Sequence, residues 1–239
     1  MSTVPPRHIA SSIEGVVQLI AASYLRHGYY WYITGQIPAN KSPTSVDTKL
    51  VNKYQIDVSD WERNRRKKAG LANAQYLRCE RWFVLLVTEG HHSLKQPTDQ
   101  GGEGDRLKDF RRHPLMVGGY SISYRRDGVS KKGQDTPNPQ YRAHVRLDPK
   151  TYRVLKSYFA SLAVHRTAVA LAKELSDLPF IRYAPVRRQL LNVARMVNDR
   201  RKPHNYEPIP YARIGLRRTI VKSYSENTDV PKPLDQKPK

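Results

Sequence analysis

The sequence predicts an α+β fold, in which helices pack on a small mixed or antiparallel sheet of about four strands. Two observations support this prediction. Apolar residues recur at helical spacing in five segments, whereas aromatic and β-branched residues are concentrated in four short runs. The segments follow one another as helix, strand, one or two helices, three strands and two helices, an order typical of α+β proteins.

The helical segments carry start and stop signals. Ser11 or Ser12 can cap the first helix and Gly28 can end it, while Asp148 followed by Pro149 is typical of a helix start. The predicted helix at residues 148–175 has room for a break at residues 161–167. The predicted helices are residues 9–26, 42–54, 60–70, 148–175 and 185–201.

The predicted strands are residues 29–33, 82–88, 115–124 and 141–147. The second is continuously apolar, which indicates burial on both faces. In the third, Gly118 and Gly119 indicate a bulge or a close approach of backbones. The fourth alternates apolar residues with Arg142, His144 and Arg146, so one face should be buried and the other basic. We assign residues 71–78 to a helix continuation or a loop, and residues 95–109 and 127–140 to loops.

The composition bounds the organisation of the chain. We expect one compact domain at residues 1–224, with a sub-boundary conceivable near residues 176–185, and a disordered, Pro- and Lys-rich tail at residues 225–239. Cys79 is the only cysteine, which excludes an intramolecular disulfide and a multi-cysteine zinc site. Glu14 interrupts the most apolar N-terminal stretch, which argues against a membrane span, so we expect a cytoplasmic or nucleoid-associated protein without membrane partners.

The charge of the chain predicts a polyanion as partner. Lys and Arg number 42 against 21 Asp and Glu, and the formal net charge is +21. A folded protein tolerates such self-repulsion best when a partner offsets it, and nucleic acid is the usual one. We favour RNA over DNA because Tyr and Arg are interleaved, which suits unpaired bases. Other proteins of a nucleoprotein complex are expected as further partners.

The candidate contacts are basic clusters and tyrosines near them. Five of the six residues from Arg63 to Lys68 are basic, and as a helix they would present charge all around, which suits backbone phosphates better than base reading. Tyr120 and Tyr124 are candidates for stacking on bases. The nucleic-acid contacts that we predict are Arg63, Arg65, Arg66, Lys67, Lys68, Arg111, Arg112, Tyr120, Tyr124, Arg125, Arg126, Lys131, Lys132, Arg142, Arg146, Arg187, Arg188, Arg200, Arg201, Lys202, Arg217 and Arg218.

Two other functions remain open. The first is a nuclease, nicking or RNA-processing enzyme of a mobile element or a CRISPR-like system, with His91 or His92 as catalytic acid or base. Adjacent histidines on an extended chain point to opposite faces, so no metal site is predicted. The second is a ribosomal-type structural protein. Phosphate-binding loops and dinucleotide fingerprints do not occur, so we expect no cofactor and favour binding over catalysis.

Overall fold

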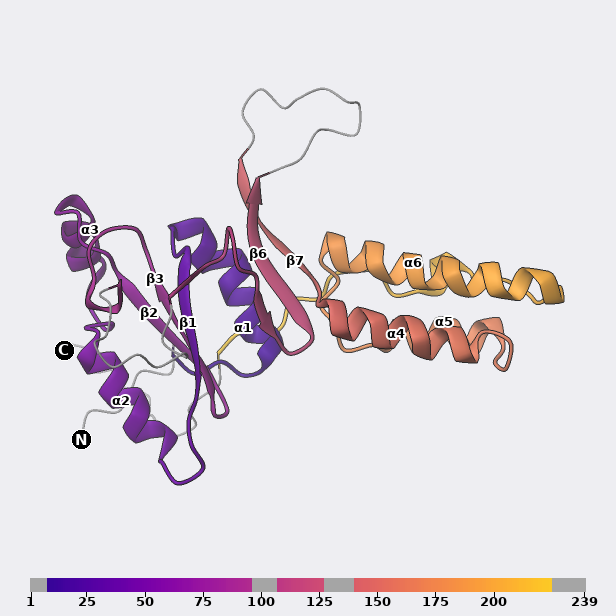
Figure 1. Ribbon diagram of the computed structural model, residues 1–239, viewed down its shortest axis with the longest axis horizontal. Helices are drawn as coiled ribbons and strands as arrows, with labels where there is room; N and C mark the ends of the chain where they lie inside the picture. The colour runs from indigo at the N-terminus through magenta and orange to yellow at the C-terminus, as the bar shows by residue number, and fades with distance from the viewer. Residues whose placement is uncertain (1–7, 96–106, 127–139, 225–239) are drawn as a thin grey trace, which may run out of the picture.

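The computed structural model describes residues 8–95, 107–126 and 140–224 and confirms the α+β class (Figure 1). The described strands form two antiparallel sheets rather than one, with four and three strands. The predicted tail at residues 225–239 lies outside the described residues, as do Lys131 and Lys132. Across the described part of the chain, no helix is long and apolar enough to cross a membrane.

The larger sheet consists of β1 (Trp31–Gln36), β2 (Ala74–Cys79), β3 (Trp82–Val87) and β4 (Lys108–Asp109), in the spatial order β2-β3-β1-β4. β3 pairs antiparallel with both β1 and β2, so the chain crosses over β3 on its way from β1 to β2. This split β-α-β arrangement is shared with ferredoxin-like folds. The prediction for residues 71–78 is wrong, because most of them form β2.

Two helices lie in the crossover, α2 (Pro43–Lys53) and α3 (Asp60–Lys68). Ser59 caps α3, since its hydroxyl accepts a hydrogen bond from the Glu62 amide at 3.2 Å. The basic run therefore forms a helix, as predicted, beside the edge of the larger sheet (Figure 1).

The N-terminal helix changes its winding along its length. α1 (Ile13–Leu19) starts at Ser12, continues through a π-helical turn (Ile20–Tyr24) and a 3-10 turn (Leu25–His27), and ends at Gly28 with a φ of +91°. Such π turns are rare and widen the helix locally. The predicted helix boundaries and both terminal signals are confirmed within a few residues.

Both faces of the larger sheet are covered, as the continuous apolar sequence of β3 predicts. Val84 and Leu86 pack in one hydrophobic cluster with the N-terminal helix, and the same cluster includes Ile122 of the second sheet. Leu85 points to the opposite face and packs with Val51 of α2. The N-terminal helix therefore joins the two sheets through a shared core.

The smaller sheet consists of β5 (Leu115–Val117), β6 (Tyr120–Arg126) and β7 (Tyr141–Leu147) in sequence order. The single strand predicted at residues 115–124 is a hairpin. Gly118 and Gly119 form its turn with φ values of +52° and +81°, the backbone that a two-residue hairpin turn of type I′ requires. β6 and β7 pair over their whole length and form a two-stranded ribbon whose end projects from the molecule (Figure 1).

The remaining helices form an arm that extends away from the sheets (Figure 1). They are α4 (Pro149–Leu162), α5 (Ala168–Ser176) and α6 (Ala184–Arg201). Asp148 caps α4 by accepting a hydrogen bond from the Thr151 amide at 2.9 Å. The break between α4 and α5 falls at the predicted place.

The arm has a hydrophobic cluster of its own, which includes Phe159, Leu171 and Val193. A separate cluster with Leu147 and Leu190 joins the arm to β7. Short 3-10 turns lie at Ser93–Lys95, Lys202–His204 and Tyr211–Arg213. The single domain expected at residues 1–224 stays a prediction, since these clusters are separate but connected.

Candidate nucleic-acid interface

The β6–β7 ribbon presents one basic face. Residues that are paired across an antiparallel ladder point to the same side, so the pairs Arg125↔Arg142 and Ser123↔His144 share a face with Arg146. Val145 and Leu147 are buried on the other side. The predicted alternation along β7 is confirmed, and its basic side leads from the free end of the ribbon toward the helical arm.

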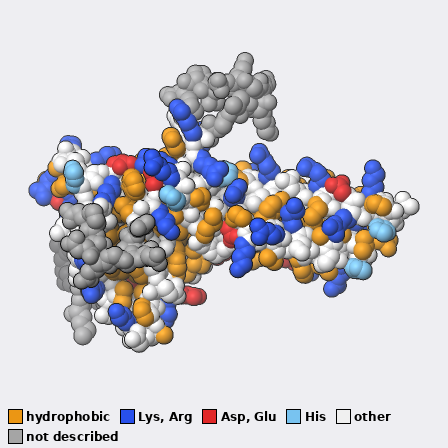
Figure 2. All heavy atoms as spheres, viewed as in Figure 1, with side chains coloured by type: hydrophobic (Ala, Val, Ile, Leu, Met, Phe, Trp, Pro, Cys, Tyr) orange, Lys and Arg blue, Asp and Glu red, His pale blue; other side chains and the backbone are white. Residues whose placement is uncertain are grey.

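A basic groove lies where β7, α4 and α6 meet. Its volume is about 710 Å³. Among the described residues that line it, four are cations from three elements and none is Asp or Glu. These cations are Arg146, Arg153, Lys156 and Arg188. On the face drawn in Figure 2, Lys and Arg side chains are spread along the arm and near the ribbon, with few acidic side chains between them.

Hydrogen bonds hold the walls of this groove together. The Gln189 amide group of α6 accepts from the Leu147 amide at 2.8 Å and donates to the Leu147 carbonyl at 3.2 Å. Asp148, the carboxylate next to the groove, is occupied by the amide and hydroxyl of Thr151. The positions of α4 and α6 relative to β7 are therefore defined by specific contacts, and among the described residues Asp148 forms no ion pair with the groove cations.

The charge of the groove is uncompensated within the described residues. No ion pair there joins a carboxylate to any of the four groove cations. Burial lowers the pKa of His144, and the nearby cations Arg125, Arg146 and Arg188 lower it further. Burial and the surrounding cations therefore both favour the neutral form of His144.

The opposite face of the ribbon carries stacked tyrosines. The ring of Tyr124 lies 4.9 Å from that of Tyr30 and 5.5 Å from that of Tyr141, with interplanar angles of 23° and 24°. The Arg111 guanidinium lies 5.0 Å from the centre of the Tyr30 ring. Burial raises the pKa of Tyr124 to about 12, and the Tyr30 hydroxyl adds to this effect. We call the three rings the tyrosine stack.

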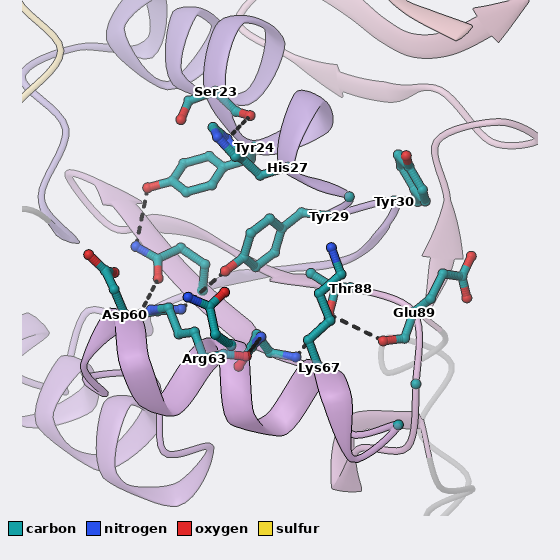
Figure 3. A pocket seen from close by; sticks show the side chains of 16 residues that line it. Ser23, Tyr24, His27, Tyr29, Tyr30, Asp60, Arg63, Lys67, Thr88 and Glu89 are labelled. Carbon is teal, nitrogen blue, oxygen red and sulfur yellow. Dashed lines mark hydrogen bonds between the residues drawn. The ribbon is translucent and has the colours of Figure 1, made fainter. Parts of the chain in front are cut away.

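The basic run on α3 is only partly available to a ligand. Figure 3 shows Arg63 rising from α3 toward Tyr29, whose hydroxyl it reaches at 3.1 Å. Arg63 also donates to the Ile56 carbonyl at 2.7 Å, and Arg66 donates to Glu62 and to Gln55. These two arginines anchor α3 to its surroundings, while Arg65, Lys67 and Lys68 are exposed.

The hollow drawn in Figure 3 has a volume of about 810 Å³ and mixed charge. Lys67 lines it together with Asp60 and Glu89. Tyr24 accepts from Gln75 at 3.2 Å, so polar groups in this hollow are already paired with one another. Although it is larger than the basic groove, its carboxylates make it a poorer site for a polyanion.

Burial corrects two of the predicted contacts. The Tyr120 side chain is fully buried, and its hydroxyl accepts from the Ile181 amide at 2.8 Å, so it cannot stack on a base. Arg201 is 4% exposed and donates to the carbonyls of Ala163, Arg166 and Glu207. Both residues stabilise the fold instead.

The other predicted cations are exposed but dispersed. Arg112 and Arg126 lie near the ribbon, Arg187 lies on α6 beside the groove, and Arg200 and Lys202 lie at the far end of the arm. Arg217 and Arg218 follow the arm, and Arg218 lies 4.3 Å from the Tyr183 ring. Of the predicted set, the basic groove contains only Arg146 and Arg188 among its described lining residues.

The two candidate catalytic histidines have different surroundings. His92 is half-buried, its Nδ1 accepts from the Leu94 amide at 3.1 Å, and it hydrogen bonds to the Tyr54 backbone. Burial lowers the pKa of His92. His91 is exposed, but the nearby Glu62 is paired with Arg65 and Arg66. These hydrogen bonds tie His92 to the surrounding loops, and a role of His91 or His92 as acid or base stays a prediction.

The residues that the sequence analysis missed come from tertiary contacts. Arg153 and Lys156 lie three positions apart on α4, a spacing that marks one helix face but does not say what faces it. Tyr141 stacks on Tyr124 as a diagonal neighbour across the β6–β7 pairing, whereas Tyr30 joins them only because the two sheets meet. Within the described residues no cluster of His, Cys, Asp and Glu could hold a metal ion.

Fold and site together describe an α+β protein with a basic groove at the junction of a β-ribbon and a helical arm. Comparisons with protein-family models, with curated proteins and with solved structures found no match. The function must therefore be argued from the chain's own residues.

Proposed function

We propose that this protein binds nucleic acid in the basic groove, with the phosphate backbone continuing along the basic face of the ribbon. The observation that carries the proposal is the convergence of Arg146, Arg153, Lys156 and Arg188 from three elements without an acidic residue among them. Protein–nucleic acid affinity comes largely from cations that replace the counterions of successive phosphates. A groove whose cations have no carboxylate partner in the described part of the chain suits such a polymer.

Size and continuity favour a polymer over a small anion. The groove, at about 710 Å³, lies in the range of sites for whole organic ligands and far exceeds one phosphate. Beyond it, Arg125 and Arg142 extend the same basic face along the ribbon. A backbone that enters the groove could therefore follow β7 past several cations.

We place the protein as a binding component of a nucleoprotein complex, with RNA favoured over DNA. The structural role of His92 and the pairing of Glu62 argue against the nuclease alternative. The proposal requires no cofactor.

The groove is tested with the double variant Arg146→Gln/Arg188→Gln. Fluorescence anisotropy with labelled RNA and DNA oligonucleotides, across a salt series, measures affinity and its salt dependence. Loss of two phosphate contacts should reduce the magnitude of the log–log salt slope by about 1.4 to 1.8. If the two proteins bind equally at 1 M salt, a slope lower by this amount means that the variant binds about 25- to 60-fold more weakly than the wild type at 0.1 M salt.

The matched control is Lys41→Gln/Lys49→Gln. It removes the same charge from two exposed lysines before and within α2, away from the arm (Figure 1). We expect a much smaller loss of affinity for this variant. Equal losses in the two variants would show that total charge, not the groove, attracts the ligand, and a wild-type protein that binds no oligonucleotide would refute the proposal.

A further inference from the structure

We infer that the tyrosine stack receives an unpaired nucleobase on the outer ring face of Tyr141, so that the bound nucleic acid is single-stranded at this point. The inference rests on the proposed function, since it concerns which form of nucleic acid is bound. It assigns a role to the face of the ribbon opposite the basic one.

Backbone contacts between the two sheets hold the stack in place. The Phe110 amide donates to the Tyr30 carbonyl at 2.9 Å, and the Tyr124 amide donates to the Phe110 carbonyl at 3.0 Å. Tyr30 and Tyr124 are thus tied to one short segment on both sides. Ring separations of 4.9 Å and 5.5 Å lie in the range of offset aromatic stacking.

One end of the stack is closed by a cation. The Arg111 guanidinium lies over the Tyr30 ring, and Asp109 and Glu89 hold it there through ion pairs of 2.8 Å and 3.0 Å. A guanidinium fixed over a ring face is a favourable cation–π arrangement. This end therefore needs no ligand.

Within the described residues, the other end of the stack is open. Tyr141 has 47% of its surface exposed, although Tyr124 backs one face of its ring. In the part of the chain that the structure describes, no further ring stacks on Tyr141. A supported ring with a free face costs little conformational entropy when a base stacks on it.

The surrounding charge favours a nucleobase over an apolar protein segment. Arg126 is paired with Tyr141 in the β6–β7 register, so the two side chains leave the ribbon on the same face from opposite positions. Arg125 is exposed on the other face. A base of a single strand brings its own phosphate to such a cation, whereas a base inside a duplex is already stacked on both sides.

The test compares the wild type with Tyr141→Ala on two single strands of equal length, one normal and one with abasic sites throughout. Both strands carry the same phosphates, so only base contacts distinguish them. We expect the wild type to prefer the normal strand and Tyr141→Ala to lose affinity for it by about 5- to 150-fold. The salt slope should not change, because tyrosine carries no charge.

Three further variants sharpen this test. Tyr141→Phe keeps the ring and should bind as the wild type does. Tyr211→Ala removes a tyrosine of similar exposure, 45%, outside the stack, and should have no effect. If thermal melting shows that Tyr141→Ala is unfolded, Tyr141→Leu replaces it, because leucine keeps apolar bulk without a stacking face.

The outcomes separate the two proposals. Equal wild-type affinity for normal and abasic strands, or a Tyr141→Ala variant that keeps wild-type affinity and preference, would overturn the inference and leave nucleic-acid binding intact. A protein that binds neither strand and no duplex refutes the proposed function itself. If the stack instead receives an apolar protein partner, the wild type should show no preference for the normal strand, and Tyr141→Ala should bind nucleic acid as the wild type does.

Discussion

Arginine side chains serve two purposes in this protein that their charge alone does not separate. Arg182 is 4% exposed and donates to the carbonyls of Phe180, Ser176 and Gly215 at 2.7 to 2.9 Å, so it ties the start of α6 to the returning chain. Arg146 lines the basic groove without a carboxylate partner among the described residues. The planar guanidinium suits both purposes, since it presents several donors in a fixed geometry.

Arg200 and Arg201 are neighbours on α6 that should differ sharply when replaced by glutamine. Arg201→Gln leaves the carbonyls of Ala163 and Arg166 without their donor, the first of them in a buried contact, and should lower the free energy of unfolding by about 2 to 4 kcal/mol. Arg200 is exposed, so Arg200→Gln should change the free energy of unfolding by less than about 0.5 kcal/mol. Urea unfolding followed by circular dichroism measures both, and equal effects would contradict the assigned role of Arg201.

The lowered pKa of His144 predicts a pH dependence of stability. An unfolded histidine binds a proton with a pKa of about 6.5, whereas folded His144 does so only at lower pH because of burial and nearby cations. As the pH falls below about 6.5, the unfolded state therefore binds more protons than the folded state. The contribution of neutral His144 to stability is fully present above this pH and is lost as the pH falls. His144→Gln should flatten the fall in unfolding free energy between pH 7 and pH 5. His92, whose pKa is also lowered, should account for part of the remaining slope.

At the scale of elements, helices and strands were predicted correctly where neighbouring residues carry a clear pattern. The cap at Asp148, the apolar run of β3 and the alternation of β7 each depend on neighbouring residues, and all three are confirmed. β2 was missed because its pattern is not local. Gln75 interrupts its apolar residues, yet this side chain is buried because Tyr24 and Arg63, far away in sequence, hydrogen bond to it.

Gly118 and Gly119 in the smaller sheet show a second kind of structure that neighbouring residues alone do not predict. Their presence indicated a special backbone, and the structure has one, a hairpin turn, in which a Cβ at Gly118 would lie 2.2 Å from the side chain of Ile13 rather than from another backbone. Whether two glycines make a bulge or a turn depends on what the following residues pair with. β6 pairs with both β5 and β7, so the chain must reverse at this point.

At the scale of the whole molecule, the chain returns from the helical arm to its own beginning. Gln18 of α1 donates to the Val221 carbonyl and to the Ser223 hydroxyl, both at 2.9 Å, and the hydroxyls of Tyr24 and Tyr224 lie 3.3 Å apart. The arm is thus connected to the rest of the molecule twice, through β7 and through this returning segment, while its tip projects away from the sheets (Figure 1). Its position beside the ribbon, and with it the groove, depends on both connections.

This arrangement predicts the effect of shortening the chain. A protein that ends at Arg218 lacks the partners of Gln18 and Tyr24, whereas a protein that ends at Tyr224 keeps them. At about 1 kcal/mol for each hydrogen bond, the shorter protein should be less stable by about 2 to 4 kcal/mol. Chemical denaturation of the two proteins measures the difference. Equal stabilities would show that the returning segment does not hold the N-terminal helix.

The sequence by itself determined the α+β class, the location of most elements and the excess of positive charge, because these follow from composition and from neighbouring residues. Only the tertiary structure decided which cations are free. Arg201 donates a hydrogen bond to the carbonyl of Ala163, 38 positions away, while Arg146 and Arg188 line one groove from β7 and α6. It also assembled Tyr30, Tyr124 and Tyr141 into one stack. Charge is a sum over residues, whereas availability depends on contacts between segments that the local sequence does not record.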